Sequence, residues 1–315
     1  MKKIPIVGAG GQIGSKLVPY LRSIYGSNNV VATDVRECKG LGDDGPFEVL
    51  DALNPTNMAS VVARHGIDTI FNLVALLSAV GEKNPQMAWG VNMGALLNSL
   101  EVARQHHCAV FTPSSIGAFG PTSPKDMTPQ DTIMQPTTVY GICKVTGELL
   151  SNYYTLKYGI DTRSIRFPGI ISNKTLPGGG TTDYAVEIYY EALRKKHYTC
   201  AVPHDVYMDM IYMPDALRAV VELMEADPAK LKHRNSFNIA SMSFTPDILA
   251  AEIRKRIPDF TMDFDVDPVK EAIANSWPNM LDDTCAREEW GWKPQWDISS
   301  MTDDMLTAVA KKLNK

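Results

Sequence analysis

The alternation of short apolar segments with longer amphipathic ones over the first 170 residues limits the fold more than any other feature of the sequence. Five apolar segments are predicted as strands: 4–7, 30–35, 69–75, 109–115 and 162–167. Four segments with helical periodicity lie between them: 12–25, 55–65, 85–106 and 139–158. Strands that alternate with helices form βαβ units, which build a parallel sheet with right-handed crossovers.

Individual residues indicate where one predicted helix ends and raise a question about the first predicted strand. The helix 139–158 has Lys157 in its last turn and Gly159 as its stop. Pro5 lies inside the first predicted strand, where proline removes a hydrogen-bond donor from the ladder. Either that strand is shorter than 4–7, or Pro5 lies where an N–H would be unpaired.

After Gly169 the alternation loosens. The segment 177–180 is a Pro-Gly-Gly-Gly loop, a helix is expected over 182–197, and shorter strands and helices follow. We predict an α/β dinucleotide-binding domain over residues 1–170, to which 207–240 returns. The remaining residues are expected to form a smaller C-terminal α/β lobe that shapes a substrate pocket: 171–206 and 241–315.

Composition and charge exclude several classes of protein. The 315 residues are 44% hydrophobic and carry a net charge of −5, so neither nucleic acid nor an anionic membrane is expected as a partner. No apolar run approaches the roughly 20 residues of a membrane span. The five cysteines are scattered without a C-x-x-C pair and the six histidines show no H-E-x-x-H spacing, so we expect free thiols and no metal. No signal or transit peptide is recognised, and a cytoplasmic protein is expected.

A glycine motif directly follows the first predicted strand. Gly8, Gly11 and Gly14 give G-x-x-G-x-x-G at the start of a helix, where the backbone can approach a pyrophosphate and the helix N-terminus offers free N–H groups. Asp34 ends the second strand about 20 residues past the last glycine, where a carboxylate binds the adenosine ribose and repels a 2′-phosphate. Arg36 could accept such a phosphate, but we expect it against the adenine or in solvent. The pattern predicts a Rossmann-type doubly wound parallel sheet that binds NAD rather than NADP.

Two further segments are candidates for the cofactor site, each with a structural alternative. Asp51 follows a short apolar segment and could contact adenine, but it is equally expected as a turn or N-cap residue before Pro55. Ala75 and Leu76 lie at the end of the strand 69–75, where the backbone passes a cofactor in such folds. Most of that segment is expected in the core.

Three residues carry the expected chemistry. Tyr140 and Lys144 form Y-x-x-x-K, and on a helix this spacing places both side chains on one face. A lysine ammonium near a phenol favours the phenolate and lowers the phenol pKa from about 10, which gives a base usable near neutral pH. Ser115 ends the fifth strand, where its hydroxyl can hold a substrate oxygen beside the phenol. A lone Y-x-x-x-K is most often surface decoration and a Ser-Ser pair can serve strand-end hydrogen bonding, but the order of all three elements argues against coincidence.

The sequence as a whole resembles the extended short-chain dehydrogenases. That family has matching residues at these positions: Gly8, Gly11, Gly14, Asp34, Asn92, Ser115, Tyr140 and Lys144. The resemblance implies that the helix asparagine Asn92 orders the active site, and that Phe167-Pro168-Gly169 brings backbone to the nicotinamide. Lys144 is implied to hold the nicotinamide ribose. The implied NAD site also includes further residues: Gln12, Ile13, Leu53, Pro113 and Ile170.

Later motifs narrow the resemblance to the short-chain-type L-threonine 3-dehydrogenases. Phe119 stands where sugar-nucleotide epimerases usually carry tyrosine. Four segments are similar to the threonine dehydrogenases: 178–185, 210–216, 276–278 and 282–292. The implied amino-acid site is lined by Ser78, Ser115, Tyr140, Gly180, Thr181, Thr182 and Trp277. The structural alternatives are loop polarity for Ser78, helix capping for Thr181 and Thr182, and core packing for Trp277.

The resemblance implies oxidation of the 3-hydroxyl of L-threonine to 2-amino-3-oxobutanoate, with Tyr140 taking the hydroxyl proton and NAD taking the hydride. It also implies a homodimer, paired through the helices 85–106 and 139–158. An NAD-dependent sugar-nucleotide epimerase or dehydratase on the same fold is the alternative, against which the 180–182 loop and Trp277 argue. A non-catalytic dinucleotide-sensing regulator is a second alternative, but such proteins can lose the catalytic groups, which are all present here.

Overall fold

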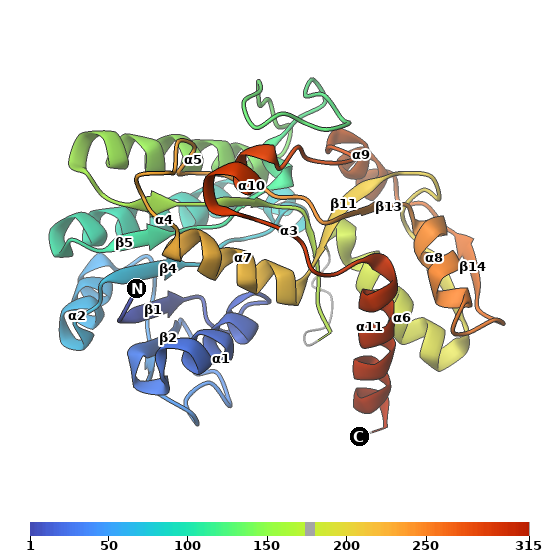
Figure 1. Ribbon diagram of the computed structural model, residues 1–315, viewed down its shortest axis with the longest axis horizontal. Helices are drawn as coiled ribbons and strands as arrows, with labels where there is room; N and C mark the ends of the chain where they lie inside the picture. The colour runs from blue at the N-terminus through green and yellow to red at the C-terminus, as the bar shows by residue number, and fades with distance from the viewer. Residues whose placement is uncertain (174–179, 315) are drawn as a thin grey trace. The chain divides into compact units, whose positions relative to one another are not determined.

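A six-stranded parallel sheet forms the centre of the N-terminal part of the protein in the computed structural model, which describes residues 1–173 and 180–314 (Figure 1). The strand order is β3-β2-β1-β4-β5-β7, and every pairing is parallel. The strands are β1 (Ile4–Val7), β2 (Val30–Asp34), β3 (Phe47–Val49), β4 (Thr69–Asn72), β5 (Ala109–Phe111) and β7 (Thr162–Arg163). This order confirms the predicted Rossmann-type sheet, whose carboxyl strand ends meet at one edge.

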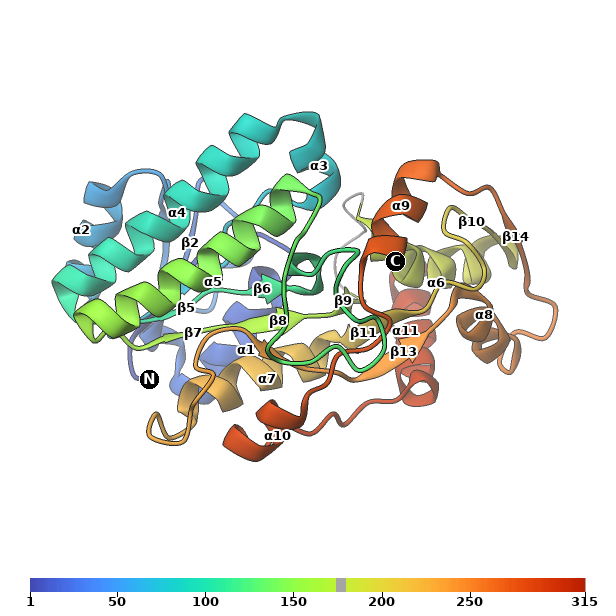
Figure 2. The ribbon, with the colours of Figure 1, turned by 90° about the horizontal axis from the view of Figure 1, so that it is seen from above.

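Helices cover both faces of this sheet. One face carries α2 (Pro55–His65), α4 (Pro85–His106) and α5 (Val139–Tyr158), and the other carries α1 (Gly14–Tyr25) (Figure 2). The predicted bounds of α2, α4 and α5 are confirmed, because local signals set them: the Asn54 side chain accepts from the Asn57 N–H at one end of α2, and Gly66 closes the other. Apolar side chains of these three helices pack together on their face of the sheet.

Two of the predicted strands are divided in the structure. The segment 109–115 breaks at Pro113 into β5 and β6 (Ser114–Ser115), and 162–167 breaks at Ser164 into β7 and β8 (Ile165–Phe167). The breaks face each other, because the Ser114 N–H donates to the Ser164 hydroxyl oxygen at 3.1 Å. After the break, β6 and β8 belong to a separate sheet with β12 (Phe237–Asn238), in the order β12-β8-β6. The strand predicted over 69–75 also stops early, at Asn72.

Pro5 is accommodated without shortening β1. All four residues of β1 are buried, and Pro5 pairs in register with Val31 of β2. The pairing of β1 with β4 begins one residue later, at Ile6 opposite Phe71. The Lys3 carbonyl oxygen already accepts the Thr69 N–H of β4 at 3.3 Å, so Pro5 removes one donor between this bond and the Ile6–Phe71 pairing, and the ladder continues on both sides of it.

The chain forms two compact units. The first comprises residues 1–115, 138–166 and 217–237, and the second comprises 116–137, 167–216 and 238–315. The predicted division grouped four segments of the second unit with the first domain instead: 116–137, 167–170, 207–216 and 238–240. The assignment of cofactor binding to one unit and of substrate binding to the other remains a proposal.

Arg163 explains why residues after 217 join the first unit. Its guanidinium donates to the carbonyl oxygens of Leu223 (2.6 Å) and Ala226 (2.8 Å), at the C-terminal end of α7 (Met213–Glu225), and pairs with Asp161 (2.7 Å). A cation that satisfies the last carbonyls of a helix favours that helix end. The interaction therefore holds the end of α7 to strand β7.

The second unit contains two small sheets and several helices. In the first sheet, β11 (Met208–Tyr212) lies between the parallel β9 (Gly169–Ile171) and the antiparallel β13 (Met242–Phe244). The second sheet pairs β10 (His197–Cys200) with β14 (Thr261–Phe264). The helices are α6 (Tyr184–Lys195), α8 (Pro246–Arg254), α9 (Pro268–Ser276), α10 (Thr284–Trp290) and α11 (Ile298–Leu313), of which α6, α8 and α11 pack against one another. The helix predicted over 182–197 begins instead with a 3₁₀ turn at Thr181–Asp183.

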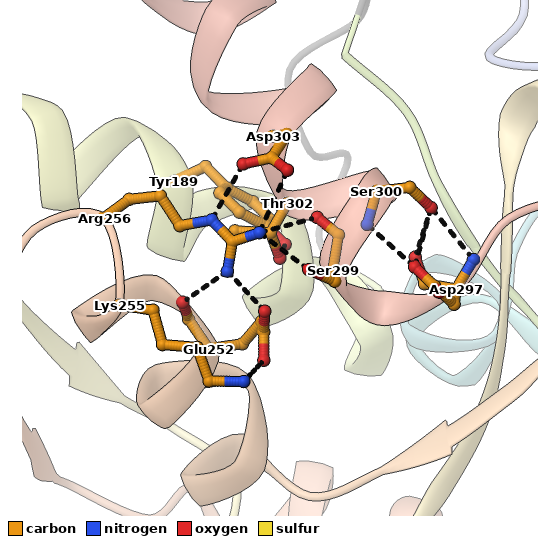
Figure 3. A network of polar contacts seen from close by, with 9 residues as sticks. All are labelled: Tyr189, Glu252, Lys255, Arg256, Asp297, Ser299, Ser300, Thr302 and Asp303. Carbon is orange, nitrogen blue, oxygen red and sulfur yellow. Dashed lines mark hydrogen bonds and ion pairs between the residues drawn. The ribbon is translucent and has the colours of Figure 1, made fainter.

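A polar network joins α8 to α11 (Figure 3). Arg256 forms an ion pair with Asp303 at 2.8 Å, donates to the Ser299 hydroxyl at 2.7 Å and contacts the buried Glu252. Arg256 follows the end of α8. Its contacts with Asp303 and Ser299 reach the first turns of α11, and its contact with Glu252 returns to α8. The network therefore satisfies the Glu252 carboxylate where the two helices meet.

Among the described residues, no helix is both long enough and apolar enough to cross a membrane.

Candidate active site

The glycine loop has the conformation and the close contacts that its sequence predicts. Gly8 has a φ of +85°, and a Cβ on it would lie 3.3 Å from the backbone of Leu73 and Val74. A Cβ on Gly14 would lie 2.5 Å from the Gly8 carbonyl oxygen, closer than any side chain tolerates. Gly11 donates its N–H to the same oxygen at 3.2 Å. The loop therefore closes tightly on the start of α1, with Gln12 and Ile13 as its last residues before the helix.

Asp34 ends β2 beside this loop. Its Oδ2 accepts the Gly10 N–H at 2.9 Å, and its Oδ1 accepts the Arg36 N–H at 3.4 Å, while the Arg36 side chain is exposed. A Cβ on Gly10 would meet the sulfur of Cys38 at 2.6 Å and Asp34 Oδ2 at 3.1 Å. Burial, followed by the Asp34 charge, raises the pKa of the Cys38 thiol. Gly10 and Cys38 were not predicted as site residues, although Gly10 is visible in the sequence as a fourth glycine of the motif.

Asn92 holds the loop that follows β4. Its amide oxygen accepts the Leu76 N–H at 2.7 Å and its amide nitrogen donates to the Leu76 carbonyl at 3.1 Å. One side chain on α4 therefore satisfies both backbone groups of a residue outside any strand. This contact fixes the path of Ala75 and gives a physical basis for the ordering role that the resemblance implied for Asn92.

Asp51 forms the turn that leads into α2. Its carboxylate accepts the Leu53 N–H at 2.9 Å, and its carbonyl oxygen accepts the Asn54 N–H at 2.9 Å. The N-cap of α2 is Asn54 rather than Asp51. The turn interpretation therefore accounts for Asp51, while Leu53 is exposed beside it and contact of either residue with a cofactor remains a proposal.

Tyr140 and Lys144 lie one turn apart near the start of α5. Thr138 caps this helix by accepting the Gly141 N–H at 3.1 Å, and Glu82 accepts the Val139 N–H at 2.8 Å. The Lys144 ammonium lies 5.3 Å from the centre of the Tyr140 ring. The same ammonium donates to the Pro113 carbonyl oxygen at 2.6 Å.

Because Pro113 is two residues before Ser115, this hydrogen bond ties the Y-x-x-x-K helix to the segment that carries the serine. Ser115 itself is half-buried in β6. The structure therefore anchors Tyr140, Lys144 and the Ser115 segment to one another within the first unit.

A small cavity lies behind these residues. Its volume is about 30 Å³, room for about one water molecule. Predicted site residues line it together: Ala75, Asn92, Pro113 and Lys144. Ser114, Glu148 and Ser151 also line it, and none of these three was singled out from the sequence.

The predicted amino-acid-binding residues lie in both units. Ser78 is buried at the start of α3 (Ser78–Lys83) in the first unit. Ser115 and Tyr140 also belong to the first unit, and the remaining four residues belong to the second: Gly180, Thr181, Thr182 and Trp277. The Gly180 N–H donates to Asp183 at 2.5 Å, so Asp183 rather than Thr182 closes this turn. Residues 174–179, including most of the predicted glycine loop, lie outside the described part of the chain.

Trp277 is 9% exposed and packs with Ile116, Phe119, Ile273 and Leu281. Core packing therefore accounts for most of the Trp277 ring, and contact of this ring with a substrate remains a proposal.

Phe167 and Ile170, predicted near the nicotinamide, lie on β8 and β9. Gly169 between them is closely covered, because a Cβ there would lie 2.7 Å from the Thr182 methyl group. The structure thus brings Thr182 against the Phe-Pro-Gly segment, within the second unit.

The model of the NAD dependent epimerase/dehydratase family matches residues 4–240 of the sequence. The chain belongs to this family. An uncharacterized epimerase/dehydratase from Staphylococcus haemolyticus is 54% identical over 314 residues, which cover 99% of each chain.

Solved structures extend the comparison within the family. L-threonine dehydrogenase from Clostridium difficile is 52% identical, with a TM-score of 0.97 over 99% of this chain and 98% of that one. The holo form of a GalE-like L-threonine dehydrogenase from Cupriavidus necator is 51% identical, with a TM-score of 0.95 over 97% and 99%. A monomeric L-threonine 3-dehydrogenase from a metagenome is 42% identical, with a TM-score of 0.94 over 99% and 100%. The protein is thus an oxidoreductase-type member of this family, with the extended short-chain dehydrogenase fold.

NAD is the cofactor of the family, and the residues present fit it. Glycine at position 14 lets α1 pack directly on the backbone of Gly8 and Ala9, where a Cβ would lie 2.5–2.8 Å away, and so holds the start of the helix at the loop that binds a pyrophosphate in this fold. Asp34 places a carboxylate beside that loop, where ribose hydroxyls can donate to it. A negative charge at this point also disfavours the additional phosphate of NADP.

Proposed function

We propose that the protein is an L-threonine 3-dehydrogenase, which oxidises the 3-hydroxyl of L-threonine to 2-amino-3-oxobutanoate. The observation that carries the proposal is the anchoring of Lys144 to both the Tyr140 ring and the Ser115 segment. It occurs in a chain that is 52% identical, over nearly its whole length, to a structure named as an L-threonine dehydrogenase. Bound NAD supplies the acceptor for the hydride from C3.

The proposed chemistry assigns one task to each of three side chains. Tyr140 takes the proton of the 3-hydroxyl as general base, and Ser115 donates a hydrogen bond to that oxygen. The Lys144 ammonium, 5.3 Å from the ring centre, is proposed to stabilise the phenolate that accepts this proton. Because Lys144 also donates to the Pro113 carbonyl, its charge is held in place rather than free to swing into solvent.

Five residues are proposed to bind the amino acid: Ser78, Gly180, Thr181, Thr182 and Trp277. Short hydroxyl side chains and backbone N–H groups suit the carboxylate and ammonium of a small zwitterion. The Trp277 ring, already mostly buried, is proposed to exclude water from the reacting centre.

We also propose that two copies pair through α4 and α5. Large apolar side chains on these helices are exposed: Met87, Trp89, Leu97, Ile142, Leu149 and Leu156. Such a group on two adjacent helices is typical of an interface. The metagenomic structure named as monomeric makes this a point for direct measurement by light scattering, in which Leu149→Glu and Leu156→Glu should dissociate the dimer.

The test is to mix purified protein with NAD and L-threonine and to follow NADH absorbance. NADP, L-serine and UDP-sugars serve as parallel reactants, and Tyr140→Phe as the catalytic control. NADH formed with threonine and NAD, and lost in Tyr140→Phe, supports the proposal. No reaction with threonine, together with thermal protection by UDP-sugars, would replace it with a sugar-nucleotide epimerase or dehydratase. Full turnover by Tyr140→Phe would remove the tyrosine from the role of base.

A further inference from the structure

Glu148 is a buried carboxylate one turn beyond Lys144 on α5. It is 5% exposed and lines the same cavity as Lys144. The catalytic roles proposed above do not use it. A carboxylate at such a position loses its hydration, which is costly unless the protein supplies charged or polar partners.

Two side chains satisfy Glu148. Arg166 makes a bidentate contact, with Nε donating to Oε1 at 3.0 Å and Nη2 donating to Oε2 at 2.8 Å. The Ser114 hydroxyl donates to Oε1 at 2.5 Å. Arg166 is also buried, so the ion pair is shielded from solvent on both sides. Because apolar packing often stabilises a core as well as a buried ion pair does, this arrangement suggests a role beyond stability.

The position of Ser114 indicates that role. Successive side chains of a strand point to opposite faces, so in β6 the Ser114 hydroxyl turns toward Glu148 and Ser115 turns to the other face. The short strand is held at consecutive residues: Lys144 holds the Pro113 carbonyl at 2.6 Å, and Ser164 accepts the Ser114 N–H at 3.1 Å. The bond from Ser114 to Glu148 adds a third restraint one residue before Ser115.

We infer that Ser114, Glu148 and Arg166 form a positioning unit that fixes Ser115 and the Pro113 carbonyl against Tyr140 and Lys144. The inference rests on the proposed function for its kinetic consequence. Glu148 connects the helix that carries Tyr140 and Lys144 to the strand that carries Ser115, because it lies on α5 and accepts a hydrogen bond from β6. A displacement of about 1 Å in such a geometry costs up to about 100-fold in rate.

The experiment compares Ser114→Thr with Ser114→Val. Threonine and valine have nearly the same shape, so both variants share the cost of a larger side chain at this position. Only threonine keeps a hydroxyl that can donate to Glu148. Ser99→Ala is the control for loss of a buried hydroxyl elsewhere: Ser99 is buried in the same unit and donates to the Ala95 carbonyl at 2.8 Å within α4. If neither larger residue folds, Ser114→Ala against Ser99→Ala gives the same comparison without added volume.

We expect Ser114→Val to have a kcat for threonine at least tenfold below that of Ser114→Thr. The KM for threonine and the Kd for NAD should agree within about twofold, because a positioning residue does not touch either ligand. Equal kcat values in the two variants, in an enzyme whose wild type oxidises threonine, would overturn the inference and leave the proposed function standing.

Crystal structures of the two variants test the inference without any assumption about the substrate. In Ser114→Val we expect β6 to shift, so that the distance from Lys144 Nζ to the Pro113 oxygen grows from 2.6 Å by about 0.5 Å or more. If wild-type protein does not oxidise threonine, the proposed function fails, and this displacement still decides whether Ser114 positions the strand. An unmoved strand in Ser114→Val would overturn the inference.

Discussion

Replacing Asn92 by alanine removes a side chain that satisfies two backbone groups at once. The Leu76 N–H and carbonyl lose partners at 2.7 and 3.1 Å. A partly buried backbone group left without a partner costs about 1–3 kcal/mol. Because Leu76 is half-buried, we take the lower part of that range for each group, which gives about 2–4 kcal/mol. Alanine recovers about 0.6 kcal/mol of helix propensity.

Asn98→Ala is the matched control. Asn98 lies on the same helix and makes a single hydrogen bond of this kind, from its amide nitrogen to the Ala52 carbonyl at 2.9 Å. The gain in helix propensity is the same in both variants and cancels in the comparison. Asn98→Ala loses one such partner where Asn92→Ala loses two, so we expect Asn92→Ala to unfold at lower urea, with a free energy of unfolding about 1–2 kcal/mol below that of Asn98→Ala.

The same comparison measures the role of the Asn92 contact in cofactor binding. Loosening the loop that carries Ala75 should weaken NAD binding about fivefold or more in Asn92→Ala, since binding must then order the loop again. Asn98→Ala should bind NAD like wild type. Equal stability and equal NAD affinity in the two variants would refute the assignment of Asn92 as the residue that orders this loop.

Three further predictions follow from contacts in the first unit and from buried thiols. Gly14→Ala forces a Cβ to within 2.5 Å of the Gly8 carbonyl, so NAD binding measured by calorimetry should fall at least tenfold; unchanged affinity would contradict the close packing of the loop. Asp34→Ser should lower the ratio of kcat/KM for NAD to that for NADP by tenfold or more, because the carboxylate that repels the extra phosphate is gone; an unchanged ratio would assign the preference elsewhere. Burial raises the pKa of Cys108 and of Cys200 to about 11. Since these values lie above the ordinary one, the stability that the protonated thiols contribute is complete below about pH 9 and is lost as the pH rises toward 11. Thermal unfolding between pH 7 and pH 11 should show this loss of stability, and a variant with alanine at both positions should lose less stability over the same range. Identical pH profiles of wild type and variant would contradict a contribution from the two thiols.

The sequence predicts those parts of the fold that depend on neighbouring residues. The ends of α2 and α5 were predicted correctly because Asn54, Gly66 and Gly159 act on their own backbone. The division of two strands at Pro113 and Ser164 was missed, because the break depends on a hydrogen bond between residues 50 positions apart in the chain. Apolar periodicity reports burial and carries no information on where a buried strand changes sheets.

The candidate site shows the same limit. Tyr140, Lys144 and Ser115 could be singled out because motif spacing identifies them. Glu148 could not, since a helical carboxylate is usually solvated and its partner Arg166 belongs to another strand. The sequence offered two signals: a glutamate one turn after Lys144 and an arginine in an apolar strand. Neither indicates a site residue alone, because their pairing depends on the fold.

The first unit is assembled from three separate pieces of chain, and this has a consequence for how the protein is made. Its last piece ends at residue 237, after two segments of the other unit, so the chain must be synthesised beyond that residue before the unit can be completed. Until α7 is synthesised, the Arg163 guanidinium has no helix end to hold. A truncated chain that ends before α7 therefore does not correspond to an autonomous nucleotide-binding domain, although it contains every glycine of the motif. Circular permutation or domain grafting in this enzyme should keep residues 217–237 with the sheet that they complete.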